Sequence, residues 1–456
     1  MEFSFNELVD ITNAHILKQN SQLKILEKIK NENIKFKIST DTRTISKDNI
    51  FLPIVGKSYD GHDFIKNAIE SGVILYFTSR KINELNLPTE KAIGLYVEDT
   101  KEAYLKLASY YKEKIDPITI AVTGSSGKTT TKEMIYAVVS QVFCCHKSEK
   151  NHNNEIGLCQ TLLSMPQSTQ VLIVEMGMRN LGEIDLLSRY TKPDIAIITN
   201  VGTAHIGILK TKENIAKAKS EICNYLKEKG ILIAEDSELI KRTINYKGDK
   251  IFYSLKSKDL KIIKEDQYGC EFEYKSYIYK LNVSGSYNIK NAICAIEVGL
   301  NLHIIEDKIQ KGLESYKPLS GRWEIEKVNN LNIINDSYNA NPDSMKESIN
   351  DFLTNYPGKK YLVLADMGEL GLDSVKYHEE IGEFLNNYKY EKLLTIGNLS
   401  KYISSKAKAD SEHFYDNESC KKYIFDKIKE GYILIKGSRS NKLEELLYNV
   451  KEKKKA

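Results

Sequence analysis

The feature that most constrains the fold is an apolar run that ends in a glycine-containing loop and continues into a helical pattern. It reads ITIAVTGSSGKTTTKEM, residues 118–134. A strand, a loop and a helix in this order direct backbone N–H groups and the positive end of a helix dipole toward one point, where phosphate oxygens bind. The residues that we expect to hold phosphates are Gly124, Ser125, Ser126, Gly127, Lys128, Thr129 and Thr130.

This loop differs from the usual G-x-x-x-x-G-K-[ST] motif, because Val122 stands at the first glycine position and a shorter G-x-x-G-K-T variant results. Within it, Lys128 is suited to reach the outer phosphates and Thr129 to place its hydroxyl on a Mg²⁺ ion. The alternative is a chance Gly/Ser turn, which the strand before it and the helix after it disfavour.

Apolar runs alternate with helical patterns after this loop. The runs VLIVEMG, DIAIITNVG and GILIAED cover residues 171–177, 194–202 and 230–236. Continuous apolar runs are typical of parallel strands buried on both faces, so the pattern predicts βαβ units. The stretch CEFEYKSYIYKLNVSG, residues 270–285, instead alternates with period two and predicts antiparallel strands at an edge of the sheet.

Two seams divide the chain. One is Asp116-Pro117, since a residue before proline avoids the helical conformation, and the other is SYKPLSGRWE, residues 315–324. Short strand and helix patterns come before the first seam. After the second seam come apolar runs, and a helical pattern follows each of them. We therefore expect an α/β fold of three domains: a small N-terminal α/β domain over residues 1–115, a central parallel-sheet P-loop domain over 116–318, and a C-terminal Rossmann-like α/β domain over 319–456.

Composition excludes several classes of protein. The 456 residues are 41% hydrophobic and 28% charged, which is typical of a globular protein with a sizeable core. The net charge of only +4 argues against a nucleic-acid partner, and the lack of a run of 18 apolar residues argues against a membrane span. Seven cysteines without C-x-x-C spacing fit a reducing compartment, so we expect a cytoplasmic location.

Glu175 and His205 follow two of the buried runs. Ligands of open α/β sheets bind at the carboxyl ends of the strands, where the phosphate loop also lies. Each residue alone is compatible with a surface carboxylate or a hydrogen-bonded loop histidine. Together they indicate a metal site, in which the carboxylate suits Mg²⁺ while histidine is an unusual ligand for that ion.

Lys219 lies on the apolar face of a helix predicted over residues 211–230, in register with Ile215, Ile222 and Leu226. A lysine on a buried face either extends its ammonium group to solvent or loses its proton. The neutral amine reacts with CO₂ to give a carbamate, an anion that could bind a second Mg²⁺. Both alternatives are compatible with the pattern.

A longer series of motifs carries a resemblance over essentially the whole chain. The motifs are GSSGKTT, NHNNEIG, VEMGM, NVGTAHIG, AKAKSEI, GSYNIKNA, SGRWE, NDSYNANPDSM, LADMGELG and IKGSR. In this order they resemble the Mur ligase family of ATP-dependent amide-forming ligases. The resemblance implies that ATP drives the joining of D-alanyl-D-alanine to UDP-N-acetylmuramoyl-tripeptide through an acyl phosphate, and we expect a monomer.

The resemblance also assigns roles to residues. It implies one Mg²⁺ at Thr129 and Glu175, and a second at Glu175, His205 and the CO₂-derived carbamate of Lys219, with Lys128 on the phosphates of ATP. The residues implied on the nucleotide are Asn288, Asn291, Arg322 and Asp336. The N-terminal domain would hold the uridine nucleotide through STDTR and YDGHDF, with Ser39, Asp41 and Arg43 on the substrate. The residues implied near the dipeptide are Asn339, Asn341, Lys436 and Arg439.

The chain departs from the family pattern at three positions. Tyr287 stands where the family usually has histidine, Cys159 replaces a usual proline, and Ala365 replaces a usual glycine. None of these changes removes an implied metal ligand. The base that deprotonates the attacking amine is not evident, and neither His62 nor His378 can be assigned to it.

Three alternatives remain open at this point. A sibling ligase would add a single amino acid instead of a dipeptide. A P-loop switch or motor ATPase would turn over ATP without a small-molecule acceptor and would have no use for a carbamate on Lys219. A non-catalytic nucleotide sensor would not need Lys128, Glu175 and His205.

Overall fold

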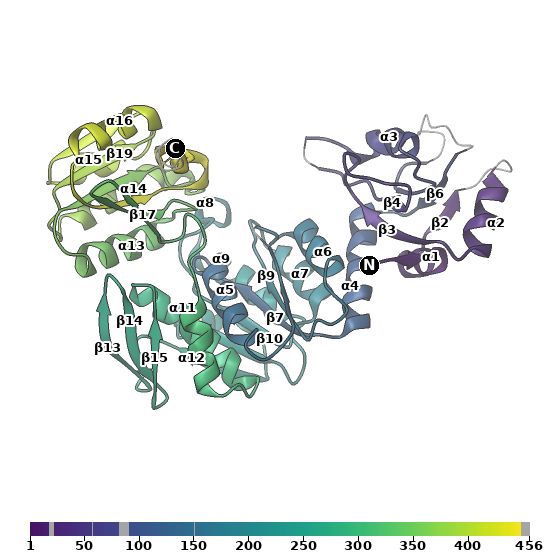
Figure 1. Ribbon diagram of the computed structural model, residues 1–456, viewed down its shortest axis with the longest axis horizontal. Helices are drawn as coiled ribbons and strands as arrows, with labels where there is room; N and C mark the ends of the chain where they lie inside the picture. The colour runs from purple at the N-terminus through teal and green to yellow at the C-terminus, as the bar shows by residue number, and fades with distance from the viewer. Residues whose placement is uncertain (18–21, 57, 82–90, 150, 448–456) are drawn as a thin grey trace. The chain divides into compact units, whose positions relative to one another are not determined.

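The computed structural model describes residues 1–17, 22–56, 58–81, 91–149 and 151–447 (Figure 1). The chain divides into two compact units. The first comprises Met1–Ile118 and Ser148–Gln170, and the second comprises Thr119–Lys147 and Val171–Ala456.

The first unit contains a mixed six-stranded sheet in the order β1-β3-β4-β5-β6-β2. The four middle strands run parallel, and the two edge strands pair antiparallel. The strands are β1 (Phe3–Ser4), β2 (His15–Leu17), β3 (Lys35–Ser39), β4 (Asn49–Phe51), β5 (Leu75–Thr78) and β6 (Ile93–Tyr96). The helices are α1 (Phe5–Thr12), α2 (Leu23–Asn31), η2 (Gly61–Phe64), α3 (Ile65–Glu70), α4 (Thr100–Ile115) and α6 (Glu155–Leu163).

Helix α4 shows how local sequence sets an element's limits. Asp99 caps its N terminus by accepting hydrogen bonds from the N–H groups of Lys101 and Glu102. It ends at Ile115, after which Asp116 adopts a left-handed conformation with φ of 50° directly before Pro117. The first predicted seam is therefore a real helix end.

The second unit begins with a six-stranded sheet in the order β12-β11-β10-β7-β9-β8. The pairs β12–β11, β11–β10, β10–β7 and β9–β8 are parallel, as the continuous apolar runs predict. The register sets Thr123 beside Ile198, so the loops after β7 and β10 leave the same edge of the sheet. The strands are β7 (Ile118–Thr123), β8 (Cys145–Lys147), β9 (Val171–Glu175), β10 (Ile195–Ile198), β11 (Ile231–Glu235) and β12 (Asp249–Tyr253).

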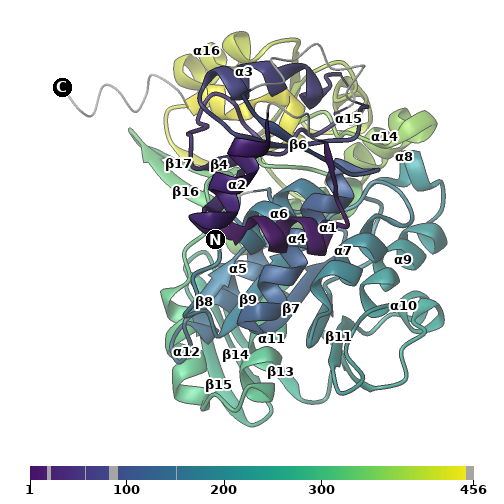
Figure 2. The same cartoon turned by 90° about the vertical axis from the view of Figure 1, so that its right-hand side faces the viewer.

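Helices connect and cover these strands, and α9 and α10 lie next to each other (Figure 2). They are α5 (Lys128–Val139), α7 (Glu183–Thr191), α8 (Ile206–Leu209), α9 (Lys212–Ser220), η4 (Glu221–Cys223), α10 (Glu238–Thr243), α11 (Ser286–Asn301) and α12 (Glu306–Ser315). The helix predicted over residues 211–230 is shorter than expected, because α9 gives way to the 3₁₀ turn η4 and then to a loop.

The period-two stretch forms antiparallel strands, as predicted, but not at an edge of the parallel sheet. Strands β13 (Leu260–Asp266), β14 (Gly269–Tyr274) and β15 (Tyr277–Leu281) make a separate three-stranded sheet. Its inward side chains include Phe272 and Tyr279, whose rings are 5.9 Å apart and buried. The sheet packs against α11 and α12, so these helices provide its apolar partner (Figure 1).

A third six-stranded sheet follows in the order β16-β17-β21-β18-β19-β20, in which only the edge strand β16 is antiparallel. The strands are β16 (Glu324–Val328), β17 (Leu331–Asp336), β18 (Lys360–Ala365), β19 (Lys392–Ile396), β20 (Ser411–Phe414) and β21 (Gly431–Lys436). The helices are α13 (Pro342–Asn355), η5 (Gly371–Asp373), α14 (Ser374–Leu385), α15 (Lys401–Lys406), α16 (Asn417–Lys427), η6 (Arg439–Asn441) and η7 (Leu443–Leu447).

The α/β class with mostly parallel sheets is confirmed, while the exact domain boundaries remain a prediction. Among the residues that the structure describes, every helix is too short or too polar to cross a lipid bilayer.

Candidate functional site

The predicted phosphate loop joins the end of β7 to the first turn of α5. Gly127 stands at the N-cap of α5 with φ of 76°, and no side chain caps the helix. The free N–H groups of that first turn are therefore directed to the loop, as an anion site requires. Gly124 has φ of 153°, and a Cβ there would lie 1.8 Å from Oγ1 of Thr199. Only glycine fits this close approach.

The loop after β10 holds the phosphate loop in place. The N–H of Ser126 donates to Oδ1 of Asn200 at 3.0 Å, and Oγ1 of Thr199 donates to the carbonyl of Ser126 at 2.6 Å. Gly202 donates its N–H to Oγ of Ser125 at 2.9 Å. Thr199 and Asn200 lie in the run DIAIITNVG, but their contacts with the phosphate loop were not predicted from the sequence.

Helix α11 supports the same loop from another side. Oγ1 of Thr131 donates to Oδ1 of Asn291 at 3.1 Å, and a Cβ on Gly127 would lie 2.6 Å from that oxygen. Asn288 is also buried and donates from its amide to the carbonyl of Ser284 at 2.7 Å. Both predicted nucleotide-side asparagines are thus fixed by hydrogen bonds, and Asn291 lies against the phosphate loop.

Glu175 is the carboxylate at the phosphate loop. Its Oε2 accepts a 2.7 Å hydrogen bond from Oγ1 of Thr129, and both side chains are buried. Nζ of Lys128 donates to the carbonyl of Gly124 at 2.9 Å. Burial lowers the pKa of Lys128, opposed by the charge of Glu175 and reinforced by that of Arg322. The structure therefore brings Lys128, Thr129 and Glu175 together, as predicted.

The predicted burial of Lys219 is confirmed, since only 2% of the residue is exposed. Within the described part of the chain its ammonium group has no hydrogen bond or ion pair. Burial, followed by the nearby charge of Lys128, lowers the pKa of Lys219 well below its usual value. Burial without a counter-ion favours the neutral, nucleophilic form of an amine, and conversion to a carbamate would supply an anion beside Lys128.

His205 follows β10 and begins the short helix α8 with φ of 65°. Its Nδ1 lies 2.5 Å from Oε2 of Glu369, although the contact is not aligned as a hydrogen bond. Among the described residues, no three His, Cys, Asp or Glu side chains lie close enough together to hold one metal ion. The structure therefore shows no ready three-ligand site at Glu175 and His205, and the site that the resemblance implies includes Lys219 as a carbamate.

Arg322 and Asp336 are positioned beyond the second seam. The guanidinium of Arg322 stacks on the ring of Tyr338 at 3.9 Å, and its charge reaches Lys128 of the phosphate loop. Asp336, at the end of β17, forms a partly buried ion pair with Lys436 and accepts a 2.7 Å hydrogen bond from Ser348. Arg322 thus lies close enough to the phosphate loop for its charge to lower the pKa of Lys128. The charge of Asp336 is instead balanced by Lys436 of the same sheet.

The residues predicted near the dipeptide have structural partners of their own. The side chain of Asn341 caps α13 by accepting from the N–H of Ser344 at 2.9 Å. Arg439 pairs with Glu444 at 2.9 Å. The carbonyl of Asn339 accepts from Lys436 at 3.4 Å, so the structure brings Asn339 and Lys436 together.

In the first unit, Ser39, Asp41 and Arg43 form a turn at the end of β3. Oγ of Ser39 donates to the carbonyl of Asp41 at 3.2 Å. The guanidinium of Arg43 holds Asp41 through three hydrogen bonds of 2.7–3.2 Å and lowers the pKa of that carboxyl to about 2. The pair is exposed, so an incoming anion would compete with Asp41 for the guanidinium.

Neither histidine that sequence reasoning left unassigned is available as a base. Nδ1 of His62 lies 2.6 Å from Oδ1 of Asp60, and its Nε2 accepts from the N–H of Ser79 at 3.0 Å. His378 is buried, its Nδ1 donates to the carbonyl of Ser374 at 2.6 Å, and its Nε2 accepts from the N–H of Met367 at 3.0 Å. In both imidazole rings, each of the two nitrogens already has a partner within hydrogen-bond distance.

Tyr287, at the unusual position, belongs to an aromatic cluster. Its ring lies 5.8 Å from that of Trp323 in an edge-to-face arrangement, and Trp323 contacts Tyr356 in the same way at 6.2 Å. Among the described residues the buried hydroxyl of Tyr287 has no hydrogen-bond partner, and burial raises its pKa well above the usual value.

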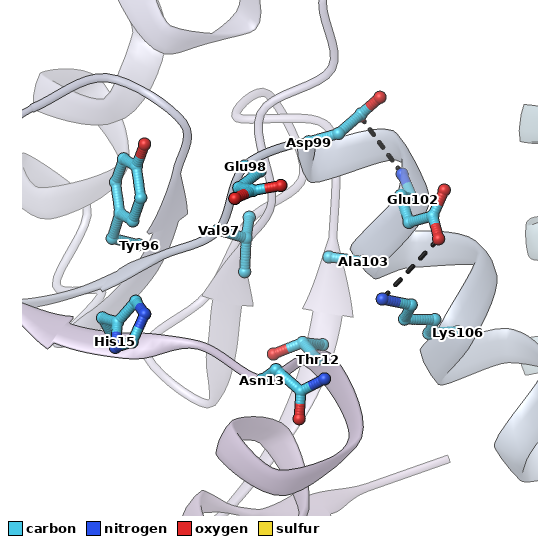
Figure 3. A pocket seen from close by; sticks show the side chains of 10 residues that line it. All are labelled: Thr12, Asn13, His15, Tyr96, Val97, Glu98, Asp99, Glu102, Ala103 and Lys106. Atoms are coloured by element: carbon cyan, nitrogen blue, oxygen red, sulfur yellow. Dashed lines mark hydrogen bonds and ion pairs between the residues drawn. The ribbon is translucent and has the colours of Figure 1, made fainter.

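The first unit also contains a pocket of about 530 Å³ (Figure 3). It lies between the end of α1, β2, β6 and the start of α4, and Figure 3 shows the Glu102–Lys106 ion pair of 3.6 Å along α4. Its lining residues are Thr12, Asn13, His15, Tyr96, Val97, Glu98, Asp99, Glu102, Ala103 and Lys106. None of the predicted site residues lines it.

Comparison with known protein families gives three consecutive matches along the chain. Residues 34–112 match the model described as Mur ligase family, catalytic domain. Residues 122–299 match the Mur ligase middle domain, and residues 321–439 match the Mur ligase, glutamate ligase domain.

Individual relatives match over nearly their full length. The chain is 37% identical over 428 residues to a UDP-N-acetylmuramoyl-tripeptide–D-alanyl-D-alanine ligase of Bacillus subtilis, covering 91% of this chain and 93% of the relative. It is 31% identical to the Escherichia coli protein of that name, covering 91% of this chain and 93% of the relative.

Solved structures agree with these relatives. A crystal structure of MurF from Acinetobacter baumannii superposes with a TM-score of 0.88 at 26% identity, covering 99% of both chains. MurF ligase from Thermotoga maritima in complex with ADP gives a TM-score of 0.83 at 29% identity, covering 92% of this chain and 99% of that one. With three family matches along the chain and a relative aligned over 93% of its length, the chain belongs to the Mur ligase family.

Proposed function

We propose that this chain is an ATP-dependent, ADP-forming ligase that joins D-alanyl-D-alanine to UDP-N-acetylmuramoyl-tripeptide. The product is the UDP-linked pentapeptide precursor of peptidoglycan. The observation that carries the proposal is similarity over nine-tenths of the chain to relatives that bear this activity in their names. The phosphate loop and the buried amine of Lys219 support it, because both suit ATP-driven acyl activation.

The first step is phosphoryl transfer. The terminal carboxylate of the tripeptide attacks the γ-phosphorus of ATP, the bond to the bridging oxygen breaks, and ADP leaves. Phosphoryl transfer depends on positioning and on neutralising charge. Lys128 and the N–H groups at the start of α5 serve that purpose, and Asn288, Asn291, Arg322 and Asp336 hold the nucleotide.

The second step is amide formation. The amine of D-alanyl-D-alanine attacks the acyl carbon, phosphate leaves with the bonding electrons, and the nitrogen releases a proton. Asn339, Asn341, Lys436 and Arg439 hold the dipeptide, while Ser39, Asp41 and Arg43 hold the uridine nucleotide. Because the acyl phosphate hydrolyses in water, the reaction needs a site that excludes solvent at this stage.

Two Mg²⁺ ions would neutralise the repulsion between the polyanionic reactants. Thr129 and Glu175 would hold one of them. Glu175, His205 and a carbamate on Lys219 would hold the other. The carbamate forms when the neutral Nζ of Lys219 bonds to the carbon of CO₂ and releases one proton to water. The lowered pKa of Lys219 supports this step, because only the unprotonated amine is nucleophilic.

The remaining assignments follow from the same proposal. We assign substrate binding to residues 1–115, ATP binding to 116–318 and the ligase domain to 319–456. The protein acts as a monomer in the cytoplasm, where ATP and the UDP-linked substrate are available.

Mass analysis of the product tests the proposal directly. The protein, ATP and Mg²⁺ are incubated with UDP-N-acetylmuramoyl-tripeptide and a mixture of D-alanyl-D-alanine and D-alanine, and Lys128→Met serves as the inactive control. We expect the tripeptide nucleotide to gain the mass of the dipeptide minus one water. Gain of a single alanine would identify a sibling ligase, and release of ADP with an unchanged tripeptide would indicate an ATPase of another class.

A further inference from the structure

The loop that carries His205 is braced by two carboxylates from beyond the second predicted seam. Oδ2 of Asp343, in the first turn of α13, accepts from the N–H of Thr203 at 2.6 Å and from its hydroxyl at 2.7 Å. Two residues further on, Nδ1 of His205 lies 2.5 Å from Oε2 of Glu369. Glu369 follows β18, so both braces come from elements around the third six-stranded sheet.

Glu369 is itself fixed at several points. Its second carboxylate oxygen, Oε1, lies 3.3 Å from Nε of Arg179, and its backbone carbonyl accepts from the N–H of Gly207 at 3.0 Å. The backbones are in close approach there, because a Cβ on Gly207 would lie 2.4 Å from the nitrogen of Gly371. The contact between Glu369 and His205 thus belongs to a larger interface, in which the segment around Glu369 packs against the segment around Gly207.

The imidazole of His205 is carried by a short segment with unusual backbone geometry. His205 has left-handed backbone geometry and opens α8, a helix of only four residues. Its ring nitrogen Nδ1 faces Oε2 of Glu369 at 2.5 Å, without the alignment of a hydrogen bond, which leaves Nε2 as the nitrogen available to a metal ion. Carboxylates behind metal-binding histidines orient the ring and increase its basicity.

We propose that Glu369 is a positioning residue that orients His205 for the second divalent ion, so that docking of the segment 366–371 completes this metal site. Glu369 does not touch the metal or the reactants and acts through the imidazole. The exposed Arg179–Glu369 pair contributes little to stability, since such pairs are worth about 0–1 kcal/mol. The effect of the Arg179 contact is to orient the carboxylate of Glu369. This inference rests on the proposed metal role of His205.

The test is binding of Mn²⁺ in the presence of bicarbonate and a non-hydrolysable ATP analogue, followed by electron paramagnetic resonance. We expect the wild-type protein to bind two ions per chain. Glu369→Gln should retain one ion and bind the second about 10- to 100-fold more weakly. Its kcat should fall and recover at high Mn²⁺, while KM for the UDP-linked substrate stays unchanged. Glu369→Asp, which keeps the charge, should be intermediate.

Glu380→Gln is the matched control. Glu380 is 35% exposed, as against 37% for Glu369, and pairs with Lys346 at 3.4 Å within its own domain. The Glu380→Gln variant should bind both ions with the affinity of the wild type. The unfolding midpoints of all variants show whether each keeps its fold. Two ions bound with wild-type affinity by Glu369→Gln, or by Glu369→Asp if the first variant is unfolded, would overturn the inference. Fewer than two ions on the wild type would instead refute the metal role of His205.

Discussion

The hydroxyl of Thr129 donates a 2.7 Å hydrogen bond to Oε2 of Glu175 and so joins the first turn of α5 to the end of β9. The two residues are 46 positions apart in the sequence and both are buried. The contact pairs a hydroxyl of the phosphate loop with a buried carboxylate. We have proposed one Mg²⁺ at this pair.

Replacing Thr129 by valine tests that pair. The change keeps the shape of the side chain and removes the hydroxyl, which leaves the buried Glu175 with one donor fewer. Such a loss costs about 1–3 kcal/mol. We expect a 10-fold or greater loss of kcat/KM for ATP and weaker Mg²⁺ dependence, measured by ADP release over a Mg²⁺ series. Thr129→Ser retains the hydroxyl and should stay within a few-fold of the wild type; equal activity of the two variants would contradict the role of the hydroxyl.

Gly127→Ala tests the close approach of the phosphate loop to Asn291. A methyl group at Gly127 would lie 2.6 Å from Oδ1 of Asn291 and would push that side chain away from Thr131. We expect ATP affinity, measured by titration calorimetry, to fall at least 10-fold. The left-handed backbone adds a loss of about 1–2 kcal/mol in unfolding free energy.

Gly182→Ala separates these two effects. Gly182 is the N-cap of α7 with φ of 86°, close to the 76° of Gly127, but a Cβ there meets nothing within 4 Å. The Gly182→Ala variant should lose a similar amount of unfolding free energy as Gly127→Ala but should keep its affinity for ATP. If both variants weakened ATP binding alike, backbone strain and not contact with Asn291 would be responsible.

Lys219→Arg should abolish turnover, because a guanidinium does not form a carbamate and would place a permanent cation in a buried site. Lys217→Arg, on the exposed side of the same helix, should be neutral. Intact-protein or peptide mass analysis at alkaline pH with bicarbonate should find the added mass of CO₂ on Lys219 in the wild type. Full activity in buffers stripped of CO₂ would contradict the carbamate.

Asp351 predicts a pH dependence of stability. It is buried in α13, where its oxygens accept from Ser284 at 3.0 Å and from Asn355 at 2.7 Å. Burial raises its pKa from 3.8 to about 7. Between these values the folded state holds more protons than the unfolded state, so the contribution of Asp351 is full below pH 4 and is lost as pH rises to 7.

The size of this loss is on the order of a few kcal/mol, since one pKa unit corresponds to about 1.4 kcal/mol. Urea unfolding at a series of pH values measures it. Asp351→Asn, which cannot ionise, should remove most of the fall between pH 4 and 7. An unchanged pH profile in this variant would show that Asp351 ionises normally in the folded protein.

Much of the site could be predicted from the sequence because its signals are local. The strand, loop and helix around Gly127 are contiguous, and the helical spacing of Ile215 and Lys219 fixes which side of α9 is buried. The burial of Glu175 also follows from its place at the end of an apolar run.

The rest depends on contacts between distant segments. The bond from Ser126 to Asn200 spans 74 residues, and no periodicity reveals it. Asp343 and Glu369 were visible in the quoted motifs, yet only the fold brings them to the His205 loop. The same holds for the strands β13 to β15: their alternation predicts one buried face, but not that α11 and α12 would cover it.

The central claim is tested most directly by ADP release from ATP and Mg²⁺ with the UDP-linked tripeptide and D-alanyl-D-alanine, D-alanine or no acceptor. The account predicts sustained turnover only when the tripeptide and the dipeptide are both present. Turnover that is indifferent to both would contradict it.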